Sequence, residues 1–128
     1  METFDELISS PEPVLVDFHA EWCAPCQTMV KVLKKIKDLQ GEAMRVIKVD
    51  IDKNPSVASH FFIQTIPTLI LFKNGKQVWR QSGVIDPVNL NKIINMFKTC
   101  HTAYSKRKNH CYSKYHLLIF FLLLSAPL

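Results

Sequence analysis

The sequence predicts an α/β fold with a central mixed four-stranded sheet, flanked by helices on both faces. A continuous apolar run at residues 14–18 is typical of a strand that is covered on both faces. An amphipathic helix and a second strand follow it, and strands joined in this way are parallel. Later in the chain, Asn74-Gly75 lies between two strand-like runs and indicates an antiparallel hairpin.

A short helix and a strand open the chain. Thr3 and Glu6 have the spacing of a capping box, and the helix that they begin is expected to end at residues 9–11. Asp17 interrupts the apolar run of the strand at 14–18. Because apolar residues flank it on both sides, we expect Asp17 to be buried and not a solvent-facing acid at the end of a strand.

The remaining elements follow from periodicity and from turn residues. A long helix begins after Cys23 and stops at Gly41. A strand over 44–49 and a third helix capped by Asn54-Pro55 come next. Strands over 69–72 and 78–81 form the hairpin, and Asp86-Pro87 opens a last helix. The stripes predicted to face the core are Met29, Val32, Leu33, Ile36 and Leu39 on the long helix, and Leu90, Ile93, Ile94 and Phe97 on the last.

The positive charge of the chain is concentrated at its C-terminal end. Of the 128 residues, which carry a formal net charge of +5, the first 98 hold 12 Lys and Arg against 11 Asp and Glu. Residues 99–128 hold four basic residues and no acid. A nearly neutral body does not present the basic surface that binds nucleic acid, so we expect no nucleic-acid partner. We expect one domain at 1–98 and a basic, then hydrophobic, tail at 99–128.

The tail and the N-terminus bear on localisation. The apolar stretch at 115–128 has 14 residues, whereas a membrane-spanning helix needs about 20. We therefore do not expect membrane association through the tail, although a basic segment can favour an anionic surface. The acidic start lacks the features of a signal peptide, which predicts a cytoplasmic protein. Cys100-His101 and His110-Cys111 offer zinc ligands, but at a gap shorter than the usual finger spacing.

Cys23 and Cys26 form a Cys-x-x-Cys motif at the start of the long helix. The free N–H groups at a helix N-terminus stabilise negative charge, so a thiol there ionises more readily and becomes a nucleophile. Cys26 lies about one turn further on the same face, within reach of a mixed disulfide on Cys23. Zinc requires four ligands, and the sequence has no second such motif. We therefore expect a redox-active pair, without metal or bound cofactor.

The order of elements, the Trp22-Cys23-Ala24-Pro25-Cys26 motif and the later Thr65-Ile66-Pro67-Thr68 motif resemble those of the thioredoxin family over about residues 3–98. The resemblance implies an exposed attacking Cys23, a buried resolving Cys26 and a cis peptide bond before Pro67. It also implies an enzyme that reduces disulfides in client proteins and receives electrons from a thioredoxin reductase. The body of the chain gives no reason to expect more than a monomer.

The same resemblance assigns roles to the neighbours of the pair. Asp17 corresponds to a buried aspartate that takes the proton of Cys26, and Lys48 to its neighbour on the adjoining strand. The residues implied to contact the substrate, which we call the substrate rim, are Trp22, Ala24, Pro25, Ile66, Pro67 and Gly83.

Some positions depart from the family pattern. Ala24 replaces the commonest glycine, Lys31 stands where many members have a proline, and His19 replaces a frequent aromatic residue. His19 either titrates near neutrality and perturbs Cys23 or has no special role. Two alternatives to a reductase stay open. One is a metal-binding module that combines the motif with the tail ligands, and the other is a non-catalytic interaction module anchored by a tail that associates with a membrane surface.

Overall fold

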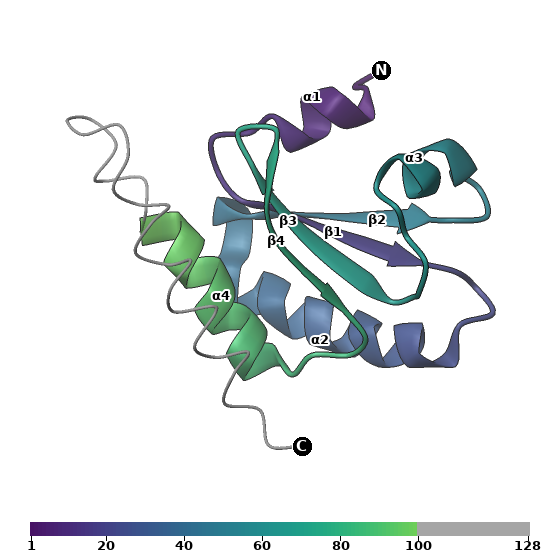
Figure 1. The fold of residues 1–128 in the computed structure, drawn as a ribbon. Coiled ribbons are helices and arrows are strands. Elements are labelled where there is room, and N and C mark those ends of the chain that lie inside the picture. Colours follow the sequence, from purple (N-terminus) through teal and green to yellow (C-terminus); the bar gives the residue numbers. More distant parts are fainter. Residues whose placement is uncertain (100–128) are drawn as a thin grey trace, which may run out of the picture.

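The computed structural model describes residues 1–99, and its elements follow the predicted order (Figure 1). The helices and strands are α1 (Phe4–Ile8), β1 (Val14–His19), α2 (Ala24–Gln40), the 3-10 turn η1 (Gly41–Ala43), β2 (Arg45–Asp50), α3 (Pro55–His60), β3 (Thr68–Lys73), β4 (Lys76–Ser82) and α4 (Pro87–Thr99).

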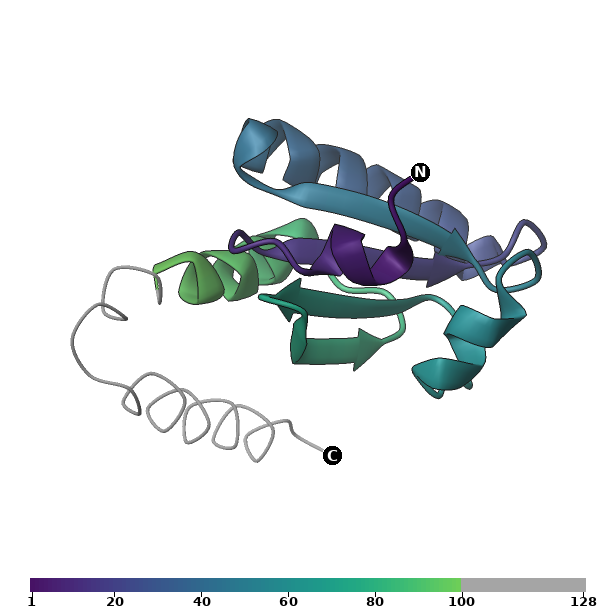
Figure 2. The ribbon, with the colours of Figure 1, turned by 90° about the horizontal axis from the view of Figure 1, so that it is seen from above.

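The four strands form one mixed sheet in the order β2-β1-β3-β4. β1 is parallel to β2 and antiparallel to β3, and β3 is antiparallel to β4. Helices α2 and α4 cover one face of the sheet, while α1 and α3 lie on the other, as Figures 1 and 2 show from two directions. The predicted α/β fold with a four-stranded mixed sheet and helices on both faces is confirmed.

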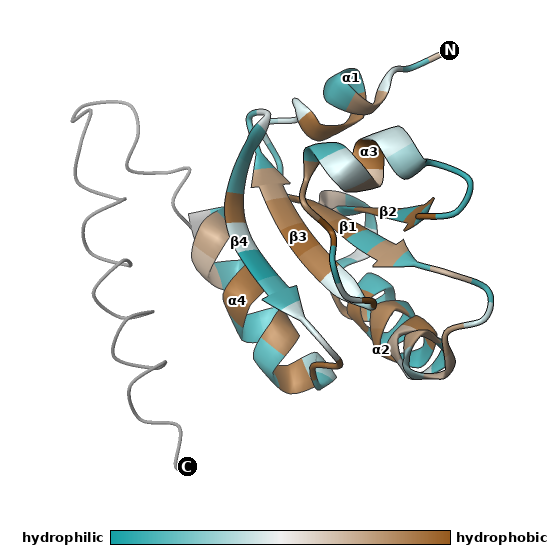
Figure 3. Ribbon diagram, turned by 45° about the vertical axis from the view of Figure 1, so that its right-hand side comes forward, coloured by the Kyte–Doolittle hydropathy of each residue, from teal (hydrophilic) through white to brown (hydrophobic). Residues whose placement is uncertain are grey.

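Side chains of β1 alternate between two cores, as the period of a strand requires. Leu15 packs with the residues of α2 and α4, whereas Val14, Val16 and Phe18 pack with those of α1 and α3. The central strand β3 is hydrophobic along most of its length (Figure 3), because both of its faces are covered. Asp17 is therefore on the face that α2 and α4 cover, beside Leu15.

Local signals in the sequence place the ends of several elements. Thr3 and Glu6 form the complete capping box of α1. Asn74 and Gly75 have φ angles of 53° and 76°, the left-handed pair that a tight hairpin turn between β3 and β4 requires. The Asp86 carboxylate accepts the backbone N–H of Asn89 at 3.0 Å and caps α4.

One expectation about the helices is wrong, and a second is confirmed only in part. Leu39 is 64% exposed, whereas Met29 and Ile36 are buried. At 3.6 residues per turn, Gln40 and not Leu39 aligns with those two residues, and Gln40 bonds to Asn91 of α4. Asn54 is the N-cap residue of α3 and Pro55 begins the helix, as predicted. The Asn54 side chain, however, makes no capping hydrogen bond and instead donates to the carbonyl oxygen of Asp50 at 3.1 Å.

Within residues 1–99, no helix is long and apolar enough to cross a membrane. The predicted tail, its Cys-His pairs and the apolar stretch at 115–128 lie outside the described residues.

Candidate active site

The two cysteines lie at the junction of β1 and α2. Cys23 is the N-cap residue of α2, and its Sγ accepts the backbone N–H of Cys26 at 3.2 Å. Pro25 lies in the first turn, where a missing N–H leaves no helical hydrogen bond unmade. Cys23 and Cys26 are joined by a disulfide with Sγ atoms 2.17 Å apart. The sequence therefore places both thiols at the helix end as predicted.

The expectation of an exposed Cys23 is wrong for this disulfide form. Cys23 is 4% exposed and Cys26 2%, so the two differ little. The disulfide turns the sulfurs toward each other, and both residues pack with Ala20, Ile51 and Ile66. Only a narrow edge of Cys23 reaches the surface.

Pro67 follows a cis peptide bond, as the family resemblance implied. Ile66 packs against the cysteines, and Gly83 donates its N–H to the carbonyl oxygen of Pro67 at 2.8 Å. The fold thus brings Ile66 to the side of the disulfide and fixes Gly83 to the same loop through Pro67. Ala24 and Pro25 are exposed at the start of α2.

Trp22 is held by a residue that sequence reasoning missed. Its Nε1–H donates to the Asp52 carboxylate at 2.8 Å, although the indole itself is largely exposed. Asp52 lies in the loop after β2, thirty positions away along the chain. Asp52 comes two residues after β2, which is parallel to β1. Because the carboxyl ends of parallel strands lie side by side, the sequence could have indicated that Asp52 lies near Trp22.

Asp17 is fully buried, as predicted. Among the described residues, neither of its carboxylate oxygens has a hydrogen-bond partner. Burial raises the pKa of Asp17, while electrostatic interaction with His19 and, to a smaller extent, with Lys48 acts in the opposite direction. Lys48 is opposite Asp17 in the register of β1 and β2, which confirms the predicted neighbourhood.

Asp50, at the end of β2, is a further ionisable neighbour that the sequence did not reveal. It is opposite His19 in the sheet register. Its burial, the largest single influence, acts to raise its pKa. The backbone N–H groups of Asp52 and Lys53, at 2.9 and 3.3 Å, together with the electrostatic effects of Lys53 and His19, leave the pKa below its ordinary value. Asp50 is thus an anion at the same end of the sheet as the disulfide.

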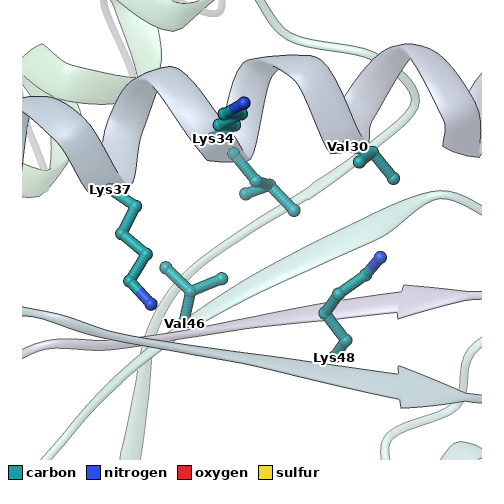
Figure 4. Close-up of a pocket in the computed structure, with 6 residues that line it drawn as sticks. Val30, Lys34, Lys37, Val46 and Lys48 are labelled. Atoms are coloured by element: carbon teal, nitrogen blue, oxygen red, sulfur yellow. The ribbon is translucent and has the colours of Figure 1, made fainter.

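A groove of about 290 Å³ lies between α2 and β2. Figure 4 shows three lysines around it, with the Lys48 side chain extending from β2 toward α2 near Val30. Lys48 is therefore an exposed residue that points into the groove, and its ammonium is not enclosed with Asp17. The lining residues are Val30, Leu33, Lys34, Lys37, Val46 and Lys48.

The part of the chain that the structure describes contains no group of three or more His, Cys, Asp or Glu side chains suited to a metal ion. The tail ligands invoked by the metal-binding alternative lie beyond residue 99.

A disulfide at a helix N-terminus, beside a cis-proline loop and an exposed tryptophan, defines a site for thiol-disulfide exchange. The family model that matches the chain is Thioredoxin, over residues 1–96. The chain belongs to the thioredoxin family. It is a thiol-disulfide oxidoreductase that reduces protein disulfides, with Cys23 and Cys26 as its Cys-x-x-Cys pair.

Curated relatives agree with this assignment. A thioredoxin of Rickettsia conorii is 49% identical over 91 residues, which are 70% of this chain and 86% of the relative. A thioredoxin-like protein of Synechocystis is 43% identical over 91 residues, or 71% of this chain and 87% of that protein. The chloroplastic thioredoxin Y of Oryza sativa is 46% identical over 88 residues, but the match spans 52% of its length and 68% of this chain.

Solved structures share the fold. The thioredoxin of Malassezia sympodialis superposes with a TM-score of 0.67 at 33% identity, covering 73% of this chain and 82% of that one. A single-site mutant of a thioredoxin from Halobacterium salinarum gives a TM-score of 0.66 at 34% identity, covering 73% of this chain and 80% of the other.

Proposed function

We propose that Cys23 attacks and Cys26 resolves in the reduction of client disulfides. The Cys23 thiolate attacks one sulfur of the substrate, the substrate S–S bond breaks, and the departing thiolate takes a proton from water. Cys26 then transfers its proton to the Asp17 carboxylate and attacks Cys23 Sγ. The second substrate thiolate leaves, two electrons have passed to the substrate, and the Cys23–Cys26 disulfide remains.

One observation carries this division of roles: Cys23 is the N-cap of α2, so its sulfur receives a backbone N–H that Cys26 itself supplies. A sulfur that accepts such a bond is stabilised as the thiolate. The position of Asp17, buried on the sheet face that α2 covers, supports its role as the base. Lys48 supports the ionised form of Asp17 from the adjoining strand.

We assign substrate contact to the rim of Trp22, Ala24, Pro25, Ile66, Pro67 and Gly83. Most of its members are exposed, whereas Pro67 is buried and Ile66 packs against the cysteines. The cis-proline loop offers backbone groups to an extended substrate segment.

Replacing each thiol separately tests the assignment. Cys26→Ser is expected to accumulate mixed disulfides with insulin or other disulfide-containing client proteins, and dithiothreitol should release them. Cys23→Ser is expected to form none. Equal reactivity of the two variants would contradict the assignment.

The setting of the activity is also a proposal. We infer a monomeric, cytoplasmic enzyme formed by residues 1–98, with a thioredoxin reductase as its electron donor and no bound cofactor. Insulin reduction by the full chain and by a chain that ends at residue 98 separates this proposal from an interaction module whose function depends on the tail. Stoichiometric zinc in the purified full chain would instead favour the metal-binding alternative.

A further inference from the structure

Acidic and basic side chains alternate on the sheet face that α2 covers, toward the end of β1 that leads to the cysteine pair. Asp17 and His19 are two residues apart on β1, so their side chains leave the same face about 6.6 Å apart along the strand. In the parallel register with β2, Asp17 is opposite Lys48 and His19 is opposite Asp50. His19 is therefore flanked by two carboxyl groups, one buried on its own strand and one on the next.

Few charged or titratable groups among the described residues lie around Asp17. On β3, the residue opposite Asp17 is the apolar Leu69. Helix α2 packs over this face, and the titratable residues that it buries are Cys26 and, at its cap, Cys23, which are joined in the disulfide. Helix α4, which covers the same face, buries only the apolar Leu90 and Ile94 within residues 87–98. In the part of the chain that the structure describes, the charged or titratable groups that act on Asp17 are thus His19 from its own strand and Lys48 from β2.

These two side chains are placed differently. Lys48 is exposed, and it extends into the groove between α2 and β2, where Lys34 and Lys37 also lie (Figure 4). His19 ends β1 and is only partly exposed. Burial is the largest influence on the pKa of Asp17 and raises it. The electrostatic effect of His19 lowers this pKa, and it is larger than that of Lys48. Screening by water weakens the charge of an exposed lysine more than that of a half-buried group.

We propose that His19 is a positioning residue of this reductase, whose charge keeps the Asp17 carboxylate ionised when Cys26 must lose its proton. The proposal rests on the proposed role of Asp17 as the base for Cys26. Imidazole ordinarily gains its proton between about pH 5 and 8. A positive charge on His19 would favour the ionised form of Asp17, so resolution would continue in more acidic solution than Lys48 alone allows.

The pH dependence of mixed-disulfide resolution tests this proposal. In single-turnover experiments, His19→Gln is expected to move the acidic limb of the resolution rate to higher pH by about half a unit or more. The same substitution in an Asp17→Asn background should move nothing. His60→Gln, which changes an exposed histidine at the end of α3, is the matched control and should retain the original profile.

Two results would overturn the proposal. One is a His19→Gln profile that coincides with that of the unmodified protein. The other is a shift that persists in the Asp17→Asn background, because His19 would then act on the cysteines without Asp17.

A second measurement separates this proposal from the proposed function. The carboxyl ¹³C resonance of Asp17, followed against pH in the oxidised protein, is expected to titrate at higher pH in His19→Gln. This readout needs no catalysis. A shifted titration in a protein that does not reduce insulin would contradict the proposed function, whereas an unshifted titration in an active protein would contradict the role of His19.

Discussion

Gly83 donates its backbone N–H to the carbonyl oxygen of Pro67, with 2.8 Å between the two atoms. This bond joins the loop after β4 to the cis-proline loop before β3, so two segments of the substrate rim are fixed to each other. Gly83 makes the bond with a φ angle of 85°, a conformation that other residues rarely adopt.

Gly83→Ala is expected to lower the free energy of unfolding by about 1–2 kcal/mol. A Cβ atom at this position would meet no other atom within 4 Å, so the cost lies in the backbone conformation. Urea unfolding measures the loss, and the KM for insulin should increase as the rim loses its fixed geometry. Val84→Ala, at the exposed neighbouring position, should change the stability by less than about 0.5 kcal/mol. Equal stability of the glycine and alanine forms would contradict this account.

Asp17→Asn is expected to change how stability depends on pH in the oxidised protein. Burial raises the folded-state pKa of Asp17 above its unfolded value of about 3.9, so the folded chain binds the proton more tightly. Stability therefore falls as the pH rises from about 4 through the folded pKa. The variant should match the original protein near about pH 3.5 and exceed it by about 1–3 kcal/mol at about pH 8.

Guanidinium unfolding across that pH range provides the measurement. Asp50→Asn is the control of opposite sign, because the lowered pKa of Asp50 contributes stability that is present above its unfolded pKa and is lost as the pH falls through its folded pKa. Parallel curves for the Asp17→Asn variant and the original protein would show that Asp17 titrates as it does in the unfolded chain.

Ile36→Ala and Leu39→Ala test the observed face of α2. Both residues belong to the apolar stripe predicted from the sequence, but Ile36 is fully buried and Leu39 is mostly exposed. Ile36→Ala is expected to cost about 2–5 kcal/mol, and Leu39→Ala less than about 1 kcal/mol. Denaturant unfolding distinguishes the two, and similar losses would indicate that the end of α2 is packed differently.

Phe62→Gly is expected to stabilise the fold by about 0.5–1 kcal/mol. Phe62 has a φ angle of 51° and is 78% exposed, so glycine relieves an unfavourable backbone conformation and removes little buried surface. The guanidinium group of Arg80 donates to the carbonyl oxygens of Phe61 and Phe62 and holds this turn in place. Phe62→Ala keeps the strained conformation and should not gain stability. A lower thermal midpoint for the glycine variant would contradict the prediction.

Short-range patterns made much of the fold predictable. The capping box of Thr3 and Glu6, the Asn74-Gly75 turn and the Cys-x-x-Cys motif each involve residues within one turn of chain. Such signals reflect local geometry, which the sequence specifies directly.

The features that the sequence did not reveal depend on register between separate elements. The pairing of His19 with Asp50 requires the alignment of β1 and β2, and the bond from Trp22 to Asp52 requires the course of a distant loop. The burial of Cys23 reflects packing by Ile51 and Ile66, which the helix-end argument did not include. Leu39 was misplaced because small errors in helical phase accumulate over several turns.

Because Cys23 is the N-cap residue of α2, one atom, Cys23 Sγ, contributes both to the structure of the helix and to the reactivity of the site. The sulfur to which we assign the attack on the substrate is also the acceptor for the backbone N–H of Cys26 in the first turn of α2. Serine at this position retains an acceptor for the helix end, whereas alanine would remove the acceptor together with the nucleophile. Loss of activity on replacing Cys23 can therefore be attributed to the missing thiol alone only when the new side chain still caps the N-terminus of α2.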